Sequence, residues 1–508
     1  MVFLAIDIGT SVTKVVAFDE KGRICVQARA SYPTHRPQPG WAEQDPEDWW
    51  KAVSEATRLV MRKLRSPKRR VEAVGLTGQM HGLVLLGRNG KPLLPCLIWM
   101  DTRAGNQAKA LAKSVGEQKL LSRTGNRPIP AFPAAKFLWV RENLPRIYKG
   151  VRWLLMPKDY IGYRLTGVIG TDPSDASGTL LYNLQLKDWD EEIVGVTGLR
   201  REFLPPISSS TSLLGKVTAK AAKELPLPAG TPVILGGGDL ATSALGVGAV
   251  TPEQVGLILG TAGQLLFAVS ESFDQLLGKF YLFAHALPGS FLGLGTLPTG
   301  GAALAWLARA LKVGEKGIEK LISSATDIPP GANGLFFLPY LAGTGTPYMD
   351  YEVRAAFLGL AEAHGPEHIV RAVLEGIGYA LRDSLQLLWD LGMCKKEIMI
   401  AGGSMRSRAL RQIFADILGR PLHLVRTIDA SPLGTFFLTA VGLGLYADLR
   451  EVCKTGVKIR ETVVPTTLSD YYAKGFEVFR YYSQRWRTEF RLKKMECAQA
   501  GYESAYTS

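Results

Sequence analysis

The chain has 508 residues, of which 46% are hydrophobic and 21% charged, with a net charge of +14. A chain of this length and hydrophobicity has room for two or more domains with buried cores, so a wholly disordered protein is excluded. The five cysteines are scattered without a CxxC pair, which argues against a disulfide framework or zinc module and favours a reducing compartment. The N-terminus lacks the basic segment of a signal peptide, and every long apolar stretch is interrupted by charges and glycines. We therefore expect a cytoplasmic protein without a membrane span.

Two segments concentrate the positive charge. Lysine and arginine make up six of the ten residues 61–70 and five of the ten residues 485–494. Nucleic-acid binding would favour interleaved aromatic residues or glycine-rich motifs, which both segments lack apart from Trp486 and Phe490. We interpret the two segments as solvated helix faces or ends and expect no nucleic-acid partner.

The first predicted elements are a hairpin and a helix. Residues 2–6 form an apolar run that ends at Asp7, and residues 14–19 follow a Gly-Thr-Ser turn. This pattern predicts strand, turn and strand, with a further turn and strand beyond them. Asp45 followed by Pro46 and two acidic residues is typical of a helix start, and apolar residues continue at helical spacing.

Strands and helices alternate in the rest of the first half. The sequence predicts strands over residues 71–75, 83–86, 96–99 and 233–235, a mainly helical region over residues 102–230 and a helix over residues 240–245.

The second half opens like the first. Residues 255–259 form an apolar strand that leads into the turn 260–263 and another strand over 264–269. Because this repeats the strand, Gly-Thr turn and strand of the N-terminus, we predict a weak internal duplication with domains of residues 1–250 and 251–508. Further elements predicted are a strand over 397–400, a helix over 407–418 and a C-terminal helix whose aromatic stripe packs in the core.

The two Gly-Thr turns carry groups that bind phosphate. Glycine lets backbone N–H groups approach an anion, and hydroxyl groups and a lysine add further donors. The first turn offers Thr10 and Ser11, with Lys14 nearby, and the second offers Gly260 and Thr261. If the two hairpins face each other, they clamp a triphosphate between two domains. Either turn alone is more typical of an ordinary hairpin.

Two aspartates follow apolar strands. A carboxylate at Asp7 suits Mg²⁺ bound mostly through water and phosphate oxygens, and the alternative role of Asp7 is to cap the following turn. Asp239 follows three glycines, and in phosphoryl transfer such a carboxylate accepts the proton of the attacking hydroxyl. The alternative role of Asp239 is the N-cap of the following helix.

Three further residues are weaker candidates for a ligand site. His81 lies in a glycine-bounded segment after a strand, but a lone histidine is usually structural. Trp99 and Asp101 come at the end of a strand and would suit a polyol, although their pattern alone does not decide it.

Together, these segments resemble the FGGY family of carbohydrate kinases, most of all its xylulokinase members. The resemblance extends from about residue 2 to about residue 490. It is carried, in order, by AIDIGTSVTKVV (5–16), PGWAEQDPEDWW (39–50), GLTGQMHGLVLL (75–86), IWMDTR (98–103), TDPSDASGTLLYN (171–183), GGGDLATSALGVG (236–248), LILGTAG (257–263), LFFLPYLAGTGTP (335–347) and AGGSMRSRALRQIFADILGRPL (401–422).

The resemblance implies an α/β fold of two actin-like, ribonuclease-H-like domains with ATP and a sugar in the cleft between them. The N-terminal domain would bind the sugar and supply Asp239 as general base, with Asp7 near Mg²⁺, and the C-terminal domain would bind the nucleotide. The residues that would contact ATP are Thr10, Ser11, Lys14, Gly260, Thr261, Gly301, Gly402, Gly403 and Ser407. Those that would contact the sugar are Met80, His81, Trp99, Asp101 and Asp239.

The implied reaction is transfer of the γ-phosphate of ATP to a terminal hydroxyl of a ketose, with D-xylulose the first choice, or of a related polyol. The chain departs from the xylulokinase pattern at Leu240, Met100, Thr344-Gly345 and Ser407. A leucine cannot form a hydrogen bond with a sugar hydroxyl, so this position would not recognise a hydroxyl group of the substrate as a polar residue does. Ribulose, erythritol or glycerol-like substrates therefore stay open, as does a nucleotide-gated binding protein without sugar transfer. The partner expected is a small-molecule sugar or polyol, and the resemblance leaves a homodimer open because dimers are common in the family.

Overall fold

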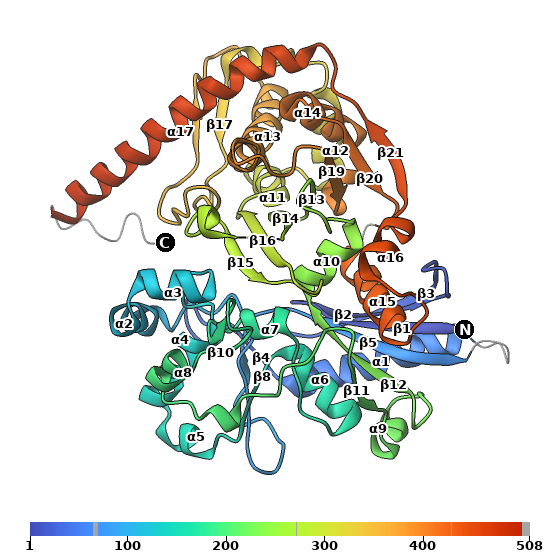
Figure 1. Ribbon diagram of the computed structural model, residues 1–508. Coiled ribbons are helices and arrows are strands. Elements are labelled where there is room, and N and C mark those ends of the chain that lie inside the picture. Colours follow the sequence, from blue (N-terminus) through green and yellow to red (C-terminus); the bar gives the residue numbers. More distant parts are fainter. Residues whose placement is uncertain (65–69, 271, 428, 500–508) are drawn as a thin grey trace. The chain divides into compact units, whose positions relative to one another are not determined.

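The computed structural model describes residues 1–64, 70–270, 272–427 and 429–499, which form two compact units (Figure 1). Among these residues, the first unit contains 1–250, 268–293 and 429–457, and the second contains the others. The predicted domain boundary at residue 250 coincides with the first point at which the chain passes from the first unit to the second. The chain then returns to the first unit twice, so two segments of the first unit follow residue 250.

The first unit is an α/β structure. Its strands are β1 (Val2–Ile8), β2 (Val12–Phe18), β3 (Ile24–Ser31), β4 (Glu43–Gln44), β5 (Val71–Gly78), β6 (Val84–Leu86), β7 (Cys96–Leu97), β8 (Trp153–Leu155), β9 (Tyr182–Asn183), β10 (Asp188–Trp189), β11 (Leu213–Lys216), β12 (Pro232–Gly238) and β15 (Tyr281–Ala284). Its helices are α1 (Pro46–Lys63), α2 (Gly105–Val115), α3 (Glu117–Thr124), α4 (Pro133–Asn143), α5 (Pro145–Gly150), α6 (Pro157–Thr166), α7 (Pro173–Ser177), α8 (Glu191–Thr197), η1 (Arg201–Phe203), α9 (Ala219–Glu224), α10 (Asp239–Val247), η2 (Asp274–Leu276), α15 (Ala430–Gly442) and α16 (Leu449–Gly456).

The main sheet of this unit is covered by helices on both faces. Its strand order is β11-β12-β5-β1-β2-β3, and successive side chains of each strand point to opposite faces. The even-numbered residues of β1 join a core with Trp49 of α1. On the other face, Phe3 packs against Phe436 of α15 with ring centroids 5.7 Å apart. Asp7 shares the parity of Phe3, so its carboxylate emerges on the α15 face.

The helix start predicted at Asp45 is confirmed. The Asp45 side chain accepts a hydrogen bond from the backbone N–H of Glu47 at 2.9 Å, and Pro46 is the first helical residue. The apolar residues of α1 are buried against β2 and β3, because their helical spacing places them on one face.

Two predicted elements differ from the structure. The strand predicted over 96–99 is shorter, because β7 ends at Leu97 and Trp99 lies in the following turn. Gly238 occupies the N-cap position of α10, and Asp239 is the first helical residue. The alternative role of Asp239 as the N-cap is therefore wrong, and its carboxyl group is not committed to that position.

Helices α10 and α15 pack with their backbones in close contact. A Cβ atom at Gly246 would lie 1.9 Å from the carbonyl oxygen of Ala430, and one at Gly434 would lie 1.8 Å from that of Thr242. Only residues without a Cβ atom allow two helix backbones to approach so closely. Because Asp239 begins α10, this contact also fixes the backbone from which the Asp239 side chain extends.

The second unit contains the remaining elements. Its strands are β13 (Gln254–Leu259), β17 (Phe336–Leu338), β18 (Ala356–Leu358), β19 (Glu397–Ala401), β20 (Leu422–Val425) and β21 (Ile459–Val463), while β14 (Gly263–Val269) and β16 (Phe291–Leu297) belong to it in part. Its helices are α11 (Gly301–Ala310), α12 (Glu315–Ser324), η3 (Ala332–Gly334), α13 (Pro366–Asp390), η4 (Gly403–Arg406), α14 (Arg408–Leu418) and α17 (Leu468–Gln499).

The two large sheets share one topology. The first runs β3-β2-β1-β5-β12-β11, and the second runs β16-β14-β13-β19-β20-β21, with β15 beyond β16. In each sheet the hairpin β1–β2 or β13–β14 is antiparallel, the next two pairings are parallel and the last is antiparallel. The predicted repeat of strand, Gly-Thr turn and strand is therefore confirmed, because both Gly-Thr turns join the two strands of the corresponding hairpin.

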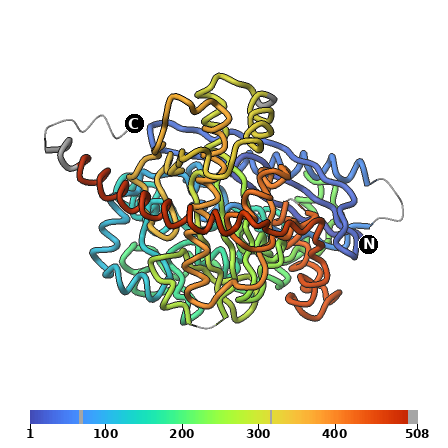
Figure 2. The backbone as a smooth tube through the Cα atoms, turned by 90° about the horizontal axis from the view of Figure 1, so that it is seen from above, coloured from blue at the N-terminus to red at the C-terminus, as the bar shows by residue number. Residues whose placement is uncertain are grey.

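The C-terminal helix α17 is 32 residues long and belongs to the second unit (Figure 2). Its buried residues Tyr472, Phe476 and Phe479 contact the ring of Tyr379 on α13. The prediction that the aromatic stripe packs in the core is confirmed for these residues.

The two basic segments are described to different extents. Of the run 61–70, residues 65–69 lie outside the described residues. In the run 485–494, Arg491 forms an ion pair with Asp350 at 2.7 Å and Lys494 with Glu352 at 2.8 Å, so part of its charge is neutralised within the unit. In the part of the chain that the structure describes, no helix combines the length and apolar character needed to cross a bilayer.

Replacing Gly246 by alanine should lower the free energy of unfolding by roughly 1–3 kcal/mol, because the added methyl group forces α10 and α15 apart. Gly195 is a matched control, since it is an exposed helical glycine of α8 with nothing within 4 Å of a Cβ atom. The Gly195→Ala change should be neutral or stabilising by up to about 1 kcal/mol. Urea unfolding midpoints compare the two variants, and a Gly246→Ala midpoint equal to that of the parent protein would contradict the close-packing argument.

Candidate functional site

Side chains from two other segments hold the turn between β1 and β2. The side-chain amide of Gln44 donates to the carbonyl oxygen of Thr10 at 2.6 Å, and the Tyr32 hydroxyl donates to that of Gly9. These bonds engage the carbonyl groups of the turn from one side. The Thr10 side chain is half-buried and that of Ser11 is exposed, so their hydroxyl groups stay accessible to a ligand.

Asp7 is a buried carboxylate with an incomplete set of counter-charges. It lies opposite Lys14 in the β1–β2 register, but the Lys14 ammonium pairs with Asp429 at 2.9 Å. Burial raises the pKa of Asp7 to about 6, with Lys14 lowering it and Asp429 raising it. Two carboxylates beside one ammonium group leave net negative charge, which a cation would neutralise.

This arrangement fits a magnesium ion that keeps most of its water. Mg²⁺ typically takes one or two carboxylates, and phosphate oxygens and water complete its shell. Asp7 can supply such a carboxylate. Within residues 1–64, 70–270, 272–427 and 429–499, no cluster of three or more His, Cys, Asp or Glu side chains forms an all-protein metal site.

Asp239 is a half-buried residue at the start of α10. Burial and the negative charge of Asp7 raise its pKa to about 7, although backbone N–H groups at the helix start act in the opposite direction. A carboxyl group that exchanges its proton near neutral pH is suited to general-base catalysis.

His81 follows β5 in the left-handed region of the backbone, with φ of 66°. Its Nδ1 lies 2.6 Å from the carbonyl oxygen of Gly178, which can only accept, so Nδ1 carries the hydrogen. Burial lowers the pKa of His81 to about 4, so the ring is neutral at pH 7 and Nε2 offers a lone pair. The rings of Phe132 and Phe283 lie 5.1 and 5.6 Å from it, which makes an apolar wall around this acceptor.

Met80 connects the His81 segment with the Asp239 segment. A Cβ atom at Gly238 would lie 2.7 Å from Met80 Cγ, so the side chain of Met80 packs directly on the backbone before Asp239. Met80 and Leu240 are both buried. The structure therefore brings Met80, His81 and Asp239 into one region of the first unit, with apolar side chains beside the carboxyl group.

Trp99 and Asp101 differ in what they offer a ligand. The Trp99 side chain is 44% exposed, and its indole N–H donates to the Thr10 hydroxyl at 2.9 Å. Asp101 is fully buried, and its carboxylate accepts from the Ala42 backbone at 2.7 Å and forms a two-pronged pair with Arg103. Both of its oxygens are engaged by these bonds, which hold the turn that carries Trp99, and a contact of Asp101 with the sugar stays a prediction.

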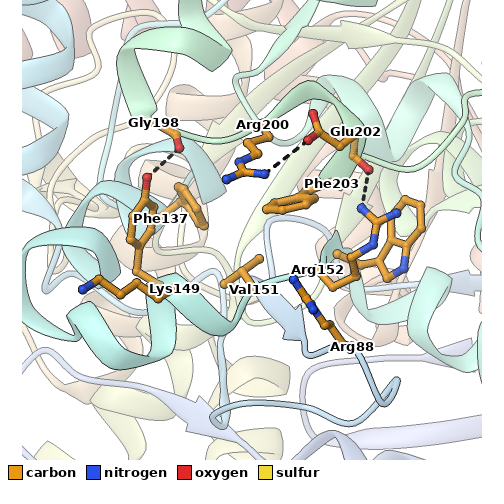
Figure 3. A pocket seen from close by; sticks show the side chains of 11 residues that line it. Arg88, Phe137, Lys149, Val151, Arg152, Gly198, Arg200, Glu202 and Phe203 are labelled. Atoms are coloured by element: carbon orange, nitrogen blue, oxygen red, sulfur yellow. Dashed lines mark hydrogen bonds and ion pairs between the residues drawn. The ribbon is translucent and has the colours of Figure 1, made fainter.

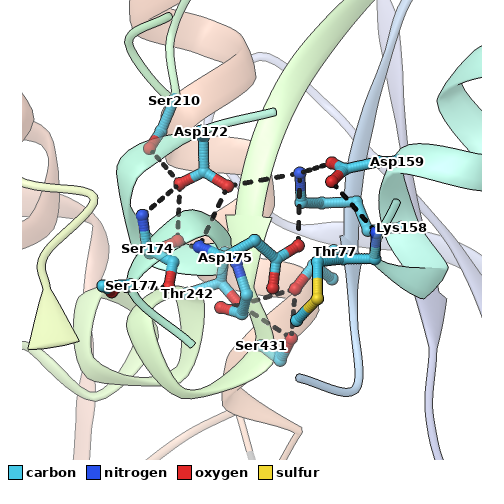
Figure 4. A network of polar contacts seen from close by, with 12 residues as sticks. Thr77, Lys158, Asp159, Asp172, Ser174, Asp175, Ser177, Ser210, Thr242 and Ser431 are labelled. Atoms are coloured by element: carbon cyan, nitrogen blue, oxygen red, sulfur yellow. Dashed lines mark hydrogen bonds and ion pairs between the residues drawn. The ribbon is translucent and has the colours of Figure 1, made fainter. Parts of the chain in front are cut away.

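A buried charge network centred on Lys158 lies beside Gly238 (Figure 4). The Lys158 ammonium lies 2.7 Å from Asp159, 3.2 Å from Asp172 and 3.4 Å from Asp175, and all four side chains are fully buried. Burial lowers the pKa of Lys158, but the three carboxyl groups outweigh it and raise the pKa. Burial and the other carboxyl groups raise the pKa of Asp175 well above its usual range.

One branch of this network reaches the residue before Asp239. The Ser174 hydroxyl donates to Asp172 at 2.5 Å and accepts from the backbone N–H of Gly238 at 2.9 Å. The ion pair of Asp172 with Lys158 extends this chain of contacts to α6. The bonds fix the backbone at Gly238 and therefore the position at which α10 begins.

In the second unit, the turn after β13 adjoins the start of α11. The Gly301 N–H donates to the carbonyl oxygen of Gly260 at 2.8 Å, and a Cβ atom at Gly301 would lie 2.8 Å from Ser404 Oγ. Thr261 is exposed, and nothing lies within 4 Å of a Cβ atom at Gly260 or Gly403. The backbone at these two glycines is therefore open to a ligand.

Gly402 and Ser407 shape the same region in different ways. Gly402 has φ of 102°, and a Cβ atom there would lie 2.4 Å from the carbonyl oxygen of Leu259, so glycine is required. The Ser407 hydroxyl accepts from the Leu410 N–H at 3.3 Å and caps α14. The glycines expected to hold a nucleotide thus lie near one another, whereas the Ser407 hydroxyl is engaged in the helix cap.

The sequence pattern does not single out Lys158, Asp175 or Lys136. Asp172-Pro173 begins α7 as Asp45-Pro46 begins α1, so the local signal is only that of a helix start. Lys136 is fully buried and donates to the carbonyl oxygens of His81, Leu97 and Ile98 at 2.8, 3.1 and 2.8 Å. Buried lysines of this kind depend on partners distant in sequence, which spacing alone does not show.

Similarity to known proteins extends over most of the chain. The model of the N-terminal domain of the FGGY family of carbohydrate kinases matches residues 2–246, and that of its C-terminal domain matches residues 257–443. A xylulose kinase of Bacillus subtilis is 32% identical and covers 97% of this chain and 95% of its own. A gluconokinase of the same organism is 30% identical and covers 87% of each chain. The crystal structure of a xylulose kinase from Lactobacillus acidophilus has a TM-score of 0.90 at 27% identity, covering 96% of this chain and 99% of its own. With both domain models matched and relatives aligned over nearly its whole length, the chain belongs to the FGGY family of carbohydrate kinases.

Proposed function

We propose that this carbohydrate kinase transfers the γ-phosphate of ATP to a terminal hydroxyl of D-xylulose. The observation that carries the proposal is the carboxyl group of the half-buried Asp239, with its pKa raised to about 7, in the same region as the neutral His81 ring. Similarity to xylulose kinases over nearly the whole chain supports this substrate. The gluconokinase that is 30% identical favours a sugar acid as the second candidate.

In the proposed reaction, the first unit holds and activates the acceptor. His81 Nε2 accepts a hydrogen bond from a sugar hydroxyl, and the apolar surface of Met80 and Leu240 borders the carbon chain. Asp239 accepts the proton of the terminal hydroxyl as that oxygen bonds to the γ-phosphorus. The bond from this phosphorus to the bridging oxygen of ADP breaks, and ADP leaves with the negative charge.

Three side chains of the first unit stabilise the negative charge of the phosphate groups. The Thr10 and Ser11 hydroxyls donate to phosphate oxygens, and the Lys14 ammonium offsets their charge. A magnesium ion held through Asp7 would supply further charge neutralisation when bound.

The second unit would hold the rest of the nucleotide. The open backbone at Gly260 and Gly403 lets a phosphate group or ribose approach closely, and the exposed Thr261 offers a hydroxyl donor. Gly301 and Gly402 would keep the neighbouring segments close enough for this, and Ser407 would act by fixing the start of α14.

The Asp239→Asn variant tests the role of the base. It keeps the size of the side chain but removes the proton acceptor, so kcat should fall by roughly 10²–10⁴-fold. Asp188→Asn, which changes a 57% exposed carboxylate of the same unit, is the control and should keep full activity.

ADP release is measured with D-xylulose, D-ribulose, erythritol, glycerol and gluconate. The highest kcat/KM on gluconate would reject the xylulose proposal, and normal turnover of a folded Asp239→Asn protein would reject the base.

The raised pKa of Asp239 predicts an acid limb in the rate profile. Since the protonated form persists up to about pH 7, kcat/KM for the sugar should rise roughly tenfold per pH unit below this value and level off above it. His81, whose pKa is lowered to about 4, stays neutral and adds no limb there. Initial rates between pH 5 and 9 at saturating ATP and Mg²⁺ check this expectation, and a flat profile down to pH 5 would contradict it.

Ser174 should act as a positioning residue. Ser174→Ala removes the acceptor of the Gly238 N–H, which should displace Asp239 and lower kcat by roughly ten- to hundredfold with little change in the KM for ATP. Ser177→Ala is the control, because this buried hydroxyl of the same helix accepts instead from the Ala284 N–H at 2.9 Å. Both variants should lose similar stability in thermal unfolding. Equal losses of kcat in the two variants, or no loss in Ser174→Ala, would show that Ser174 does not position Asp239.

A further inference from the structure

The first unit contains a cavity of about 650 Å³ that is lined by residues other than those assigned to the kinase site (Figure 3). It is lined by α4, the segment from α5 to β8, the turn after β6 and the residues around η1. Cavities of this size are typical of small-molecule sites. The cavity therefore has room for a ligand of nucleotide size.

Aromatic side chains form the inner part of this cavity. Phe137 and Val151 are buried at its base, and Trp153 and Phe203 are half-buried in its walls. Tyr148 is fixed beside them, because its hydroxyl donates to the carbonyl oxygen of Gly198 at 2.8 Å. These rings offer flat apolar surface on which a planar group can stack.

The cavity also carries an excess of positive charge. Arg88, Lys149, Arg152 and Arg200 line it together with one acidic residue, Glu202. The pair of Arg200 with Glu202 is exposed and 3.7 Å long, so it neutralises little charge. Within the described ranges, neither Arg88 nor Lys149 has an ion pair or side-chain hydrogen bond.

Arg152 joins the charged and aromatic parts of the cavity. Its guanidinium carbon lies 4.6 Å from the ring centroid of Trp153 and 5.3 Å from that of Phe203. One of its nitrogens donates to the backbone carbonyl of Glu202 at 3.1 Å. This holds the planar guanidinium in place while its other N–H groups stay available, and Figure 3 shows Arg88, Arg152 and Arg200 around the ring of Phe203.

We propose that this cavity is a second binding site, which takes a nucleoside phosphate. The guanidinium group of an arginine can donate two parallel hydrogen bonds to the oxygens of a phosphate group. The aromatic walls provide flat surfaces on which the base of a nucleotide can stack. A simple sugar phosphate would satisfy the cations but leave the aromatic walls without a planar partner. The proposal goes beyond phosphate transfer and holds whichever sugar is the acceptor.

Equilibrium dialysis with ADP tests the number of sites. The parent protein should bind a second molecule of ADP per chain, and Arg88→Ala/Lys149→Ala should weaken that site by roughly tenfold or more while leaving the first unchanged. Lys109→Ala/Lys113→Ala, which removes two exposed charges of α2 in the same unit, is the matched control and should keep both sites. A single ADP site in the parent protein, or two unchanged sites in Arg88→Ala/Lys149→Ala, would overturn the proposal.

Competition experiments identify the part of the ligand that is recognised. AMP should displace ADP from the second site at lower concentration than ribose 5-phosphate, because only AMP carries a base. If ribose 5-phosphate displaces ADP as well as AMP does, the site recognises phosphate alone and the nucleotide proposal is overturned. Kinase turnover of Arg88→Ala/Lys149→Ala is measured in parallel, so loss of the second site is distinguished from failure of the kinase reaction.

Discussion

The ammonium group of Lys158 has no contact with water, so its charge must be balanced by neighbouring side chains. Asp159 of α6, Asp175 of α7 and Asp172, the N-cap of α7, do this at 2.7–3.4 Å. Asp172 also accepts a hydrogen bond from the Ser174 hydroxyl. Such buried charges are tolerated only when they are paired and hydrogen-bonded. The position of Gly238, and with it the start of the helix that carries Asp239, follows from how this one charge is neutralised.

The same principle explains why two neighbouring titratable groups behave differently. Burial favours the neutral form of both Asp239 and His81, which moves the pKa of the carboxyl group up and that of the imidazole down. A carboxyl group that titrates near neutral pH and an imidazole that stays neutral are complementary, because one accepts a proton and the other orients a hydroxyl. One apolar environment thus prepares both groups for the proposed reaction.

Local signals in the sequence predicted the local parts of the structure. The Asp45-Pro46 helix start, the opening hairpin and the repeated Gly-Thr turn each depend on residues close in sequence, and the structure confirms them. The pairing of Lys14 with Asp429 and the return of residues 429–457 to the first unit depend on contacts between distant segments. The bond from the Ala42 backbone to Asp101 likewise joins segments that are far apart in sequence. Local signals thus predicted the elements that carry the candidate residues, while the charge balance around those residues required the folded chain.

The close contact of α10 with α15 has a consequence for the order in which the protein folds. Helix α10 carries Asp239, but Gly434 and Ala430, which it packs against, emerge from the ribosome almost two hundred residues later. During synthesis, the face of the first sheet against which α15 packs stays exposed until residues 294–427 of the second unit have been translated. Domains of most proteins complete folding as they emerge, in N-to-C order. Here the earlier unit can be completed only after most of the later one has been translated, which makes chaperone protection of the nascent chain valuable.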